Sequence, residues 1–283
     1  MKFSIFTVML PDWDPATAVK KLKAYGYDGV EWRVTNTKPE VKNDAPSYWG
    51  NNHCTVELDT ILEKAKEIKK LTDDAGIATA ALAGYHGYDN VEATEKMLKA
   101  AKIMGAPLIR VGAARYDGSR HFDELFKESR KGYEEVAKMA GKAKVKACVE
   151  THMGMICASA SGARRLLDGL DPKAVGVIYD PGNMVTEGYE DTRMGLQILG
   201  PYLAHVHGKN GVWLKNPDAK PGEHPWTSGF HTPVDEGIVN WTKVLKALKD
   251  VGFNGYISFE DFSKVRTTEE KVKFNIEYIK SKM

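Results

Sequence analysis

Four ionisable residues stand at or next to the ends of four consecutive apolar segments in the second half of the chain. They are Glu150, Asp180, His207 and Glu260. Three carboxylates that met without a counter-charge would repel one another strongly, and a divalent cation is the simplest group that holds them together. Carboxylate oxygens with one imidazole suit Mn²⁺, Co²⁺ or Mg²⁺, with Zn²⁺ as a further alternative. The residue types therefore predict one divalent metal ion, and affinity alone does not choose among these metals. Mn²⁺ is the ion that we expect.

Each of these residues also has a simpler explanation when it is taken alone. An acidic residue after a strand often caps the next helix, and a histidine in an apolar segment is often a hydrogen-bonded core residue. The agreement in position favours the metal site, because side chains at equivalent strand ends of a barrel converge on its axis.

The segments that must position these residues follow one pattern along the whole chain. Short apolar or β-branched runs alternate with longer stretches of helical periodicity, which is typical of repeated βα units around a parallel sheet. We expect eight strands, at residues 3–10, 29–34, 78–84, 108–113, 146–151, 175–180, 203–210 and 255–261. Their near-continuous apolar character predicts burial on both faces. The predicted fold class is therefore α/β, a single (β/α)8 TIM barrel that forms one domain over residues 1–283.

Residues two apart on a strand share a face, so the interior of the predicted barrel can be read from each strand. We expect a layer of side chains beneath the metal, formed by Cys148, Ile178, His205 and Ser258. His152 and Lys209 stand above the metal and are predicted to contact the substrate. The alternatives are a general-acid role for either residue, or an ion pair between Lys209 and a carboxylate.

Two further residues stand near the ends of predicted strands and are candidates for substrate binding. They are Arg33, in the strand at 29–34, and His86, just after the strand at 78–84. Ordinary ion pairs or helix capping explain both residues equally well.

Two connections are longer than the others and follow predicted strands at the face where barrel enzymes build their sites. They are residues 35–56, with Tyr48 and Trp49, and residues 211–238, with Trp213, Trp226 and Phe230. We interpret them as lids. The alternatives are surface insertions that pack on their own side chains, or a contact between subunits of a homo-oligomer.

The composition excludes several classes of partner. Forty basic residues against 38 acidic ones give a net charge of +2, and no basic stretch with interleaved aromatics indicates a nucleic-acid groove. The apolar run near the N-terminus is too short to span a membrane. The cysteines, at positions 54, 148 and 157, lack the spacing of a disulfide framework or a zinc site. These features predict a cytoplasmic protein with no nucleic-acid or membrane partner.

Four segments of this sequence resemble the xylose isomerase-like superfamily. They are VKACVETHMG, VGVIYDPGN, LAHVHGKNG and the stretch from TPVDEG to ISFED. The most similar branch is the sugar isomerase/epimerase group, which includes ketose 3-epimerases, inosose dehydratases and endonuclease IV. The resemblance implies that Glu150, Asp180, His207 and Glu260 are the metal ligands. It also selects the second histidine of the pair at 205 and 207.

The sequence departs from that family pattern at two points. Asn183 stands where the epimerases and endonucleases usually carry a histidine, and we expect it to contact the substrate. The Asp-x-His of the three-zinc endonuclease site falls near residues 229–231 and lacks its Asp. A three-metal phosphodiesterase is therefore not expected.

The predicted function is a metal-dependent sugar isomerase or epimerase acting on a ketose or keto-sugar. Glu150 and Glu260 would remove and return a proton through an enediolate intermediate. The main alternative is a lyase, either an inosose-type dehydratase or an enzyme that performs β-elimination on a 3-keto-glycoside. A third alternative is a sugar-binding subunit without catalytic activity, although it has no need of two such carboxylates.

Overall fold

Eight parallel strands close into a barrel around a central axis. The computed structural model describes the backbone of residues 1–283 and every side chain except that of Phe230. The barrel strands are β1 (Lys2–Phe6), β2 (Gly29–Val34), β3 (Ala78–Gly87), β4 (Leu108–Gly112), β5 (Lys146–Glu150), β6 (Val175–Tyr179), β7 (Leu203–Gly208) and β10 (Tyr256–Phe259). Their order around the ring is β1-β10-β7-β6-β5-β4-β3-β2. The predicted (β/α)8 TIM barrel is confirmed.

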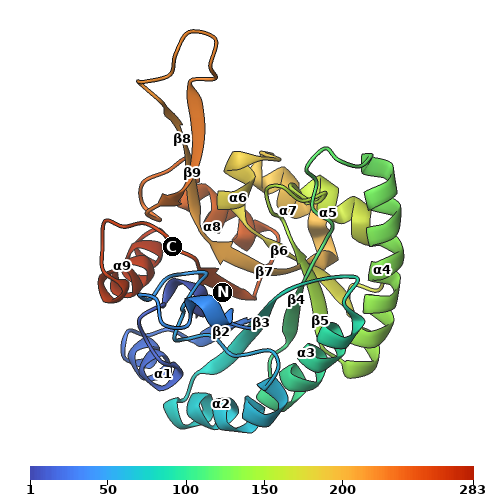
Figure 1. Cartoon of the computed structure of the whole chain (residues 1–283), viewed down its shortest axis with the longest axis vertical. Coiled ribbons are helices and arrows are strands. Elements are labelled where there is room, and N and C mark those ends of the chain that lie inside the picture. Colours follow the sequence, from blue (N-terminus) through green and yellow to red (C-terminus); the bar gives the residue numbers. More distant parts are fainter.

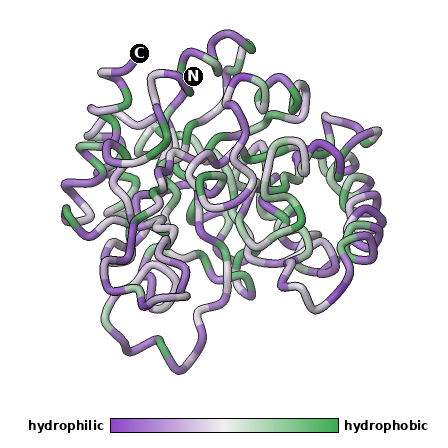
Figure 2. The backbone as a smooth tube through the Cα atoms, turned by 90° about the horizontal axis from the view of Figure 1, so that it is seen from above, coloured by the Kyte–Doolittle hydropathy of each residue, from purple (hydrophilic) through white to green (hydrophobic). Residues whose placement is uncertain are grey.

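Helices surround the strands on the outside of the barrel (Figure 1). They are α1 (Pro15–Ala24), α2 (Ile61–Ala75), α3 (Val91–Met104), α4 (Phe122–Ala143), α5 (Ala160–Leu167), α6 (Pro181–Thr186), α7 (Thr192–Leu199), α8 (Trp241–Asp250) and α9 (Thr268–Ser281). Figure 2 shows hydrophobic and hydrophilic residues alternating along the helical turns, as expected for helices with one buried face. Among the residues that the structure describes, none of these helices has the length and apolar character to cross a bilayer.

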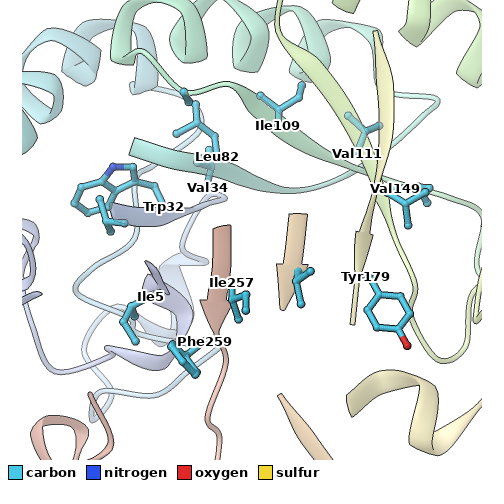
Figure 3. Close-up of a cluster of buried hydrophobic side chains, with 14 of the residues drawn as sticks. Ile5, Trp32, Val34, Leu82, Ile109, Val111, Val149, Tyr179, Ile257 and Phe259 are labelled. Atoms are coloured by element: carbon cyan, nitrogen blue, oxygen red, sulfur yellow. The ribbon is translucent and has the colours of Figure 1, made fainter. Parts of the chain in front are cut away.

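The alternation of side chains along the strands separates two environments. One set of large apolar side chains packs in the main core cluster, and Figure 3 shows members of this set from six of the strands: Ile5, Trp32, Leu82, Ile109, Val149 and Ile257. The alternate residues face the inside of the barrel, where Cys148 and Ile178 pack with Ala81 and Leu108. His205 and Ser258 are also fully buried. The layer predicted beneath the metal therefore lies inside the barrel.

The first predicted strand was too long. After Phe6 the chain forms a 3₁₀ helix at Thr7–Met9, all of whose residues are buried. The hydroxyl of Thr7 accepts a hydrogen bond from the backbone N–H of Arg33 at 2.8 Å, which holds this turn against β2. An apolar run reports burial rather than strand geometry, so the sequence pattern could not show where the strand ends.

An antiparallel hairpin was missed within the long connection at 211–238. Strands β8 (Asn210–Lys215) and β9 (Trp226–Thr232) pair with each other outside the barrel and project from it (Figure 1). The Asn210 side chain anchors the base of the hairpin, because its amide donates to Val234 O at 2.9 Å and its oxygen accepts from Val239 N at 2.9 Å. The predicted strand at 203–210 therefore ends at Gly208, and Asn210 begins a separate element.

Candidate metal centre

The four predicted ligands come together at one end of the barrel. Ligand atoms of Glu150, Asp180, His207 and Glu260 all lie within 4.8 Å of one another. The His207 Nδ1 atom is 2.9 Å from Glu150 Oε1, 3.6 Å from Glu260 Oε1 and 3.8 Å from Asp180 Oδ2. No member of the group is more than 7% exposed. Three carboxylates thus surround a single imidazole in a site with little access to water.

The residues present fit a divalent cation. Asp180 follows β6, and its Oδ1 atom caps α6 by accepting from the backbone N–H of Asn183 at 2.8 Å. Its other oxygen, Oδ2, is buried and accepts no hydrogen bond from the described residues, and the nearest cationic nitrogens are Lys209 Nζ at 3.7 Å and His207 Nδ1 at 3.8 Å. A buried acceptor without a hydrogen bond is costly, and a metal ion would satisfy it. Helix capping and metal binding are therefore compatible roles for the same carboxylate.

The electrostatic environments of the two glutamates differ. Burial raises the pKa of Glu150, but Arg110 and His207 outweigh that effect and hold this pKa well below its ordinary value. Burial also raises the pKa of Glu260, and there Lys209 and His207 offset the effect only in part. Burial lowers the pKa of His207, but Glu260 and the other nearby carboxylates outweigh it, so the pKa lies well above its ordinary value. The raised pKa of Glu260 and the raised pKa of His207 both reflect an excess of negative charge around the imidazole.

Glu31 is a part of this site that the sequence analysis missed. It lies in β2, is fully buried, and accepts from His205 Nε2 at 2.9 Å and from His207 Nε2 at 3.3 Å. A carboxylate on one ring nitrogen fixes the tautomer of a metal-binding histidine and leaves the other nitrogen free for the ion. Glu31 thus orients His207 so that Nδ1 faces the carboxylate group. The sequence feature that could have identified Glu31 is a charged residue inside the buried strand GVEWRV.

Arg110 was also missed. It lies in β4 and donates from Nη1 to Glu150 Oε2 at 2.7 Å and from Nε to Gly84 O at 3.0 Å. Its guanidinium carbon is 4.7 Å from the centre of the Tyr85 ring. Arg110 therefore gives Glu150 a fixed cationic partner, and the signal was again a charge inside an apolar strand.

A cavity of about 610 Å³ opens above the four residues. Its lining includes the two glutamates but neither Asp180 nor His207. The polar residues around the glutamates are Arg110, His152, Lys209 and His86. The cavity is within the range of about 300–1,000 Å³ that small-molecule sites occupy. A molecule bound there can reach Glu150 and Glu260, whereas Asp180 and His207 are fully buried and do not line the cavity.

The predicted substrate-binding residues divide into two groups. His152, Lys209 and His86 line the cavity, whereas Arg33 and Asn183 do not. Arg33 is 3% exposed and donates to Trp49 O at 3.0 Å, so it supports the loop at the rim. Asn183 is fully buried, donates to Glu150 Oε1 at 3.2 Å and accepts from Lys209 Nζ at 2.8 Å. Both residues position neighbours of the cavity, and we assign neither a substrate contact.

The two predicted lids lie differently relative to the cavity. Trp49, from the connection at 35–56, is part of the lining. Trp213 and Trp226 of the β8–β9 hairpin are outside the lining, and Trp213 Nε1 donates to Val185 O at 2.7 Å. The side chain of Phe230 lies outside the described residues. A lid role for either segment stays a prediction, as does a contact between subunits.

We predict that Glu31→Gln weakens metal binding by about 10- to 100-fold, the usual effect of losing a partner of a metal-binding histidine. The amide offers one acceptor oxygen where the carboxylate accepts from two imidazoles, so one ring loses its partner. Competition with a chelator of known affinity measures the change. The exposed Glu63→Gln is the control, and equal affinities in the two variants would contradict the role of Glu31.

We predict a pH effect from His86. Burial and Arg110 lower the pKa of His86 from 6.5 to about 4. The unfolded chain therefore binds more protons than the folded one between these values, and the free energy of unfolding falls as the pH drops from 6.5 to 4. Above 6.5 this contribution is fully present. In urea unfolding at several pH values, the wild-type protein should lose more stability over this interval than His86→Gln. Parallel curves would refute the shift.

The chain is similar in sequence to curated inosose dehydratases. The inosose dehydratase of Bacillus velezensis is 25% identical over 146 residues, which are 50% of this chain and 48% of that protein. The inosose dehydratase of Clostridium perfringens is 26% identical over 224 residues, which are 71% of this chain and 72% of that protein. The chain thus spans about half the length of the Bacillus relative that it matches.

Solved structures share the fold at low identity. The apo 3-keto-D-glucoside 4-epimerase of E. coli has a TM-score of 0.72 at 15% identity, over 99% of both chains. The IOLI protein with a bound zinc atom has a TM-score of 0.71 at 16% identity, over 100% of this chain and 99% of that one. The family described as xylose isomerase-like TIM barrel matches residues 19–282. Because this match covers nearly the whole barrel, the chain belongs to the xylose isomerase-like TIM barrel family.

Proposed function

We propose that this protein is a metal-dependent enzyme that epimerises or isomerises a keto-sugar by moving a proton on the carbon next to the carbonyl. One observation carries the proposal. Of the four residues in the candidate metal centre, the two that line the cavity are Glu150 and Glu260, the two glutamates that can exchange protons with a bound molecule. A site built only to hold an ion has no need to expose its carboxylates to a cavity.

The metal site would serve this chemistry directly. A divalent ion held by Glu150, Asp180, His207 and Glu260 would supply Lewis-acid stabilisation of negative charge that develops on the substrate oxygens. We propose Mn²⁺, with Co²⁺, Mg²⁺ and Zn²⁺ as the alternatives that suit the same ligand types. The chain itself fixes the ligands from behind, through Glu31 on His207 and through the helix cap on Asp180.

The two glutamates reach the cavity from separate parts of the ring. Glu150 ends β5 and Glu260 follows β10, with β6 and β7 between these strands. Arg110 holds Glu150, and Lys209 Nζ lies 3.2 Å from Glu260 Oε2, so each carboxylate has its own cation. Two carboxylates whose environments push their pKa values apart are suited to opposite roles in proton transfer. One glutamate then removes the proton and the other returns a proton to the same carbon. Return to the opposite face of that carbon gives epimerisation.

The other polar residues of the cavity are suited to orient a carbohydrate. Neither ring nitrogen of His86 has a hydrogen-bond partner among the described residues. Because the pKa of His86 is lowered to about 4, the ring is neutral at pH 7 and can both donate to and accept from hydroxyl groups. His152 and Lys209 line the cavity together with Glu150 and Glu260. We assign all three residues to substrate hydroxyl or carbonyl contacts.

A dehydratase or another lyase is the second candidate, and one observation favours it. The curated relatives in Bacillus and Clostridium are named inosose dehydratases. A lyase also needs a general acid to protonate the leaving hydroxyl, and Lys209 lines the cavity beside Glu260. Burial lowers the pKa of Lys209, but Glu260 and Asp180 outweigh it and raise this pKa, which keeps the side chain an ammonium group and makes it a weaker acid. Both candidates share the first step at the two glutamates.

The setting of the enzyme follows from the same features. The substrate that we propose is a small carbohydrate, and neither a nucleic acid nor a membrane is required. The three cysteines, Cys54, Cys148 and Cys157, are free and buried, which suits a reducing cytoplasm. Assembly into a homo-oligomer is compatible with the projecting hairpin.

We predict that Glu150→Gln and Glu260→Gln each reduce turnover by about 10² to 10⁴, because each removes a proton-transfer group. NMR of ketoses, inososes and 3-keto-glycosides in D₂O, with Mn²⁺ removed before the spectra, identifies the reacting carbon by deuterium. A variant that still exchanges the substrate proton but forms no product supports epimerisation. Loss of a hydroxyl or glycosyl group supports a lyase. Normal turnover in both variants with metal bound would contradict the assignment.

A further inference from the structure

We propose that the substrate carries a planar apolar substituent, as an aryl glycoside does, and that this group stacks on an aromatic wall at the cavity mouth. This inference rests on the proposed function for the position of the reacting ring. The aromatic wall consists of Trp49, Tyr85 and Phe262, which all line the cavity.

The cavity has two chemically different parts. The charged residues Glu150, Glu260 and Lys209 belong to its buried end, since each is at most 7% exposed. Trp49 and Tyr85 are 46% and 43% exposed, so their aromatic surfaces face water at the cavity mouth. The third residue of the wall, Phe262, is 2% exposed and its ring centre is 5.0 Å from Lys209 Nζ, so it supports the wall from the buried end. Met153 and Met155 add flexible apolar side chains to the lining. A sugar ring satisfies the polar end, whereas the exposed aromatic surface is suited to an apolar group.

The aromatic wall is held in place before any ligand binds. Trp49 packs on Phe262 with ring centroids 4.8 Å apart. The Tyr48 ring packs on both, with centroid distances of 5.2 Å to Phe262 and 5.6 Å to Trp49. The Tyr48 hydroxyl accepts from Lys271 Nζ at 2.6 Å and donates to Ser263 O at 3.2 Å. Lys271 comes from α9 and is only 2% exposed. A buried lysine thus fixes the rear of the wall.

A second set of contacts fixes the Tyr85 side. The guanidinium of Arg33 is 5.2 Å from the centre of the Tyr85 ring, and its Nη2 donates to Trp49 O at 3.0 Å. One buried arginine therefore links the two exposed aromatic residues. Groups that are already ordered lose little conformational entropy on binding, which favours recognition of a rigid planar group.

The size of the cavity agrees with a substrate of two parts. Its volume of about 610 Å³ lies in the middle of the range for cavities that hold drug-sized ligands. A single hexose is much smaller than a drug-sized ligand. A free hexose over the glutamates leaves the aromatic wall in contact with water. An aryl group on the same sugar buries that surface and adds aromatic stacking to the burial.

Calorimetric titration of the Mn²⁺-loaded protein with phenyl β-D-glucoside, methyl β-D-glucoside and cellobiose tests this inference. We expect the phenyl glucoside to bind about tenfold more tightly than the methyl glucoside, from stacking and burial together. Trp49→Ala should remove most of that preference. The matched control is Trp226→Ala, because Trp226 is 48% exposed, lies in β9 and does not line the cavity. This control should keep the wild-type preference.

Equal affinity for the two glucosides, binding of neither, or a preference that survives Trp49→Ala would overturn the inference. Tighter binding of cellobiose than of the phenyl glucoside would also overturn it, since a second sugar ring would then be the occupant. The outcome is separable from that of the proposed reaction. Phenyl preference without deuterium exchange refutes only the proton transfer, whereas exchange without phenyl preference refutes only the aromatic subsite.

Discussion

The mutual repulsion of three buried carboxylates around His207 is the constraint on which the rest of this site depends. Glu150, Asp180 and Glu260 have oxygens within 3.8 Å of one imidazole nitrogen, and all three are nearly inaccessible to water. A cation at their centre converts that repulsion into ligation. The surrounding charged residues then have separate roles. Arg110 and Lys209 each balance one glutamate, and Glu31 orients the imidazole from the side away from the carboxylates.

Burying several charges costs folding free energy. The closed barrel offsets this cost, because the outward-facing residues of the same strands build the apolar core. Ile109 and Val149 pack in that core, while their strand neighbours Arg110 and Glu150 pair inside the barrel. Functional charges and stabilising apolar groups therefore alternate along single strands. The loop at 35–56 lines the cavity through Trp49, and Lys271 of α9 holds this loop by donating to the Tyr48 hydroxyl.

Much of this arrangement could be predicted from the sequence, since strand alternation and strand ends are local properties. They were enough to bring Glu150, Asp180, His207 and Glu260 together. Glu31 could not be assigned in the same way, because its partner His205 lies 174 residues further along the chain and the pairing depends on closure of the ring. Strand ends also give no information on depth: Arg33 and Asn183 were predicted to contact the substrate, and neither is among the residues that line the cavity. The β8–β9 hairpin was not predicted, because its strands pair only with each other and do not belong to the barrel pattern.

Metal content of the purified chain after dialysis, in the wild-type protein and in Asp180→Asn, tests the central claim most directly. Asparagine keeps the shape and the helix cap of Asp180 but removes a charge from the site. The control is Asp191→Asn, since Asp191 caps α7 by accepting from Met194 N at 3.0 Å and lies outside the metal centre. The account predicts one divalent ion per chain in the wild type and the control, and sharply reduced occupancy in Asp180→Asn. Full occupancy in Asp180→Asn, or three zinc ions per chain, would contradict it.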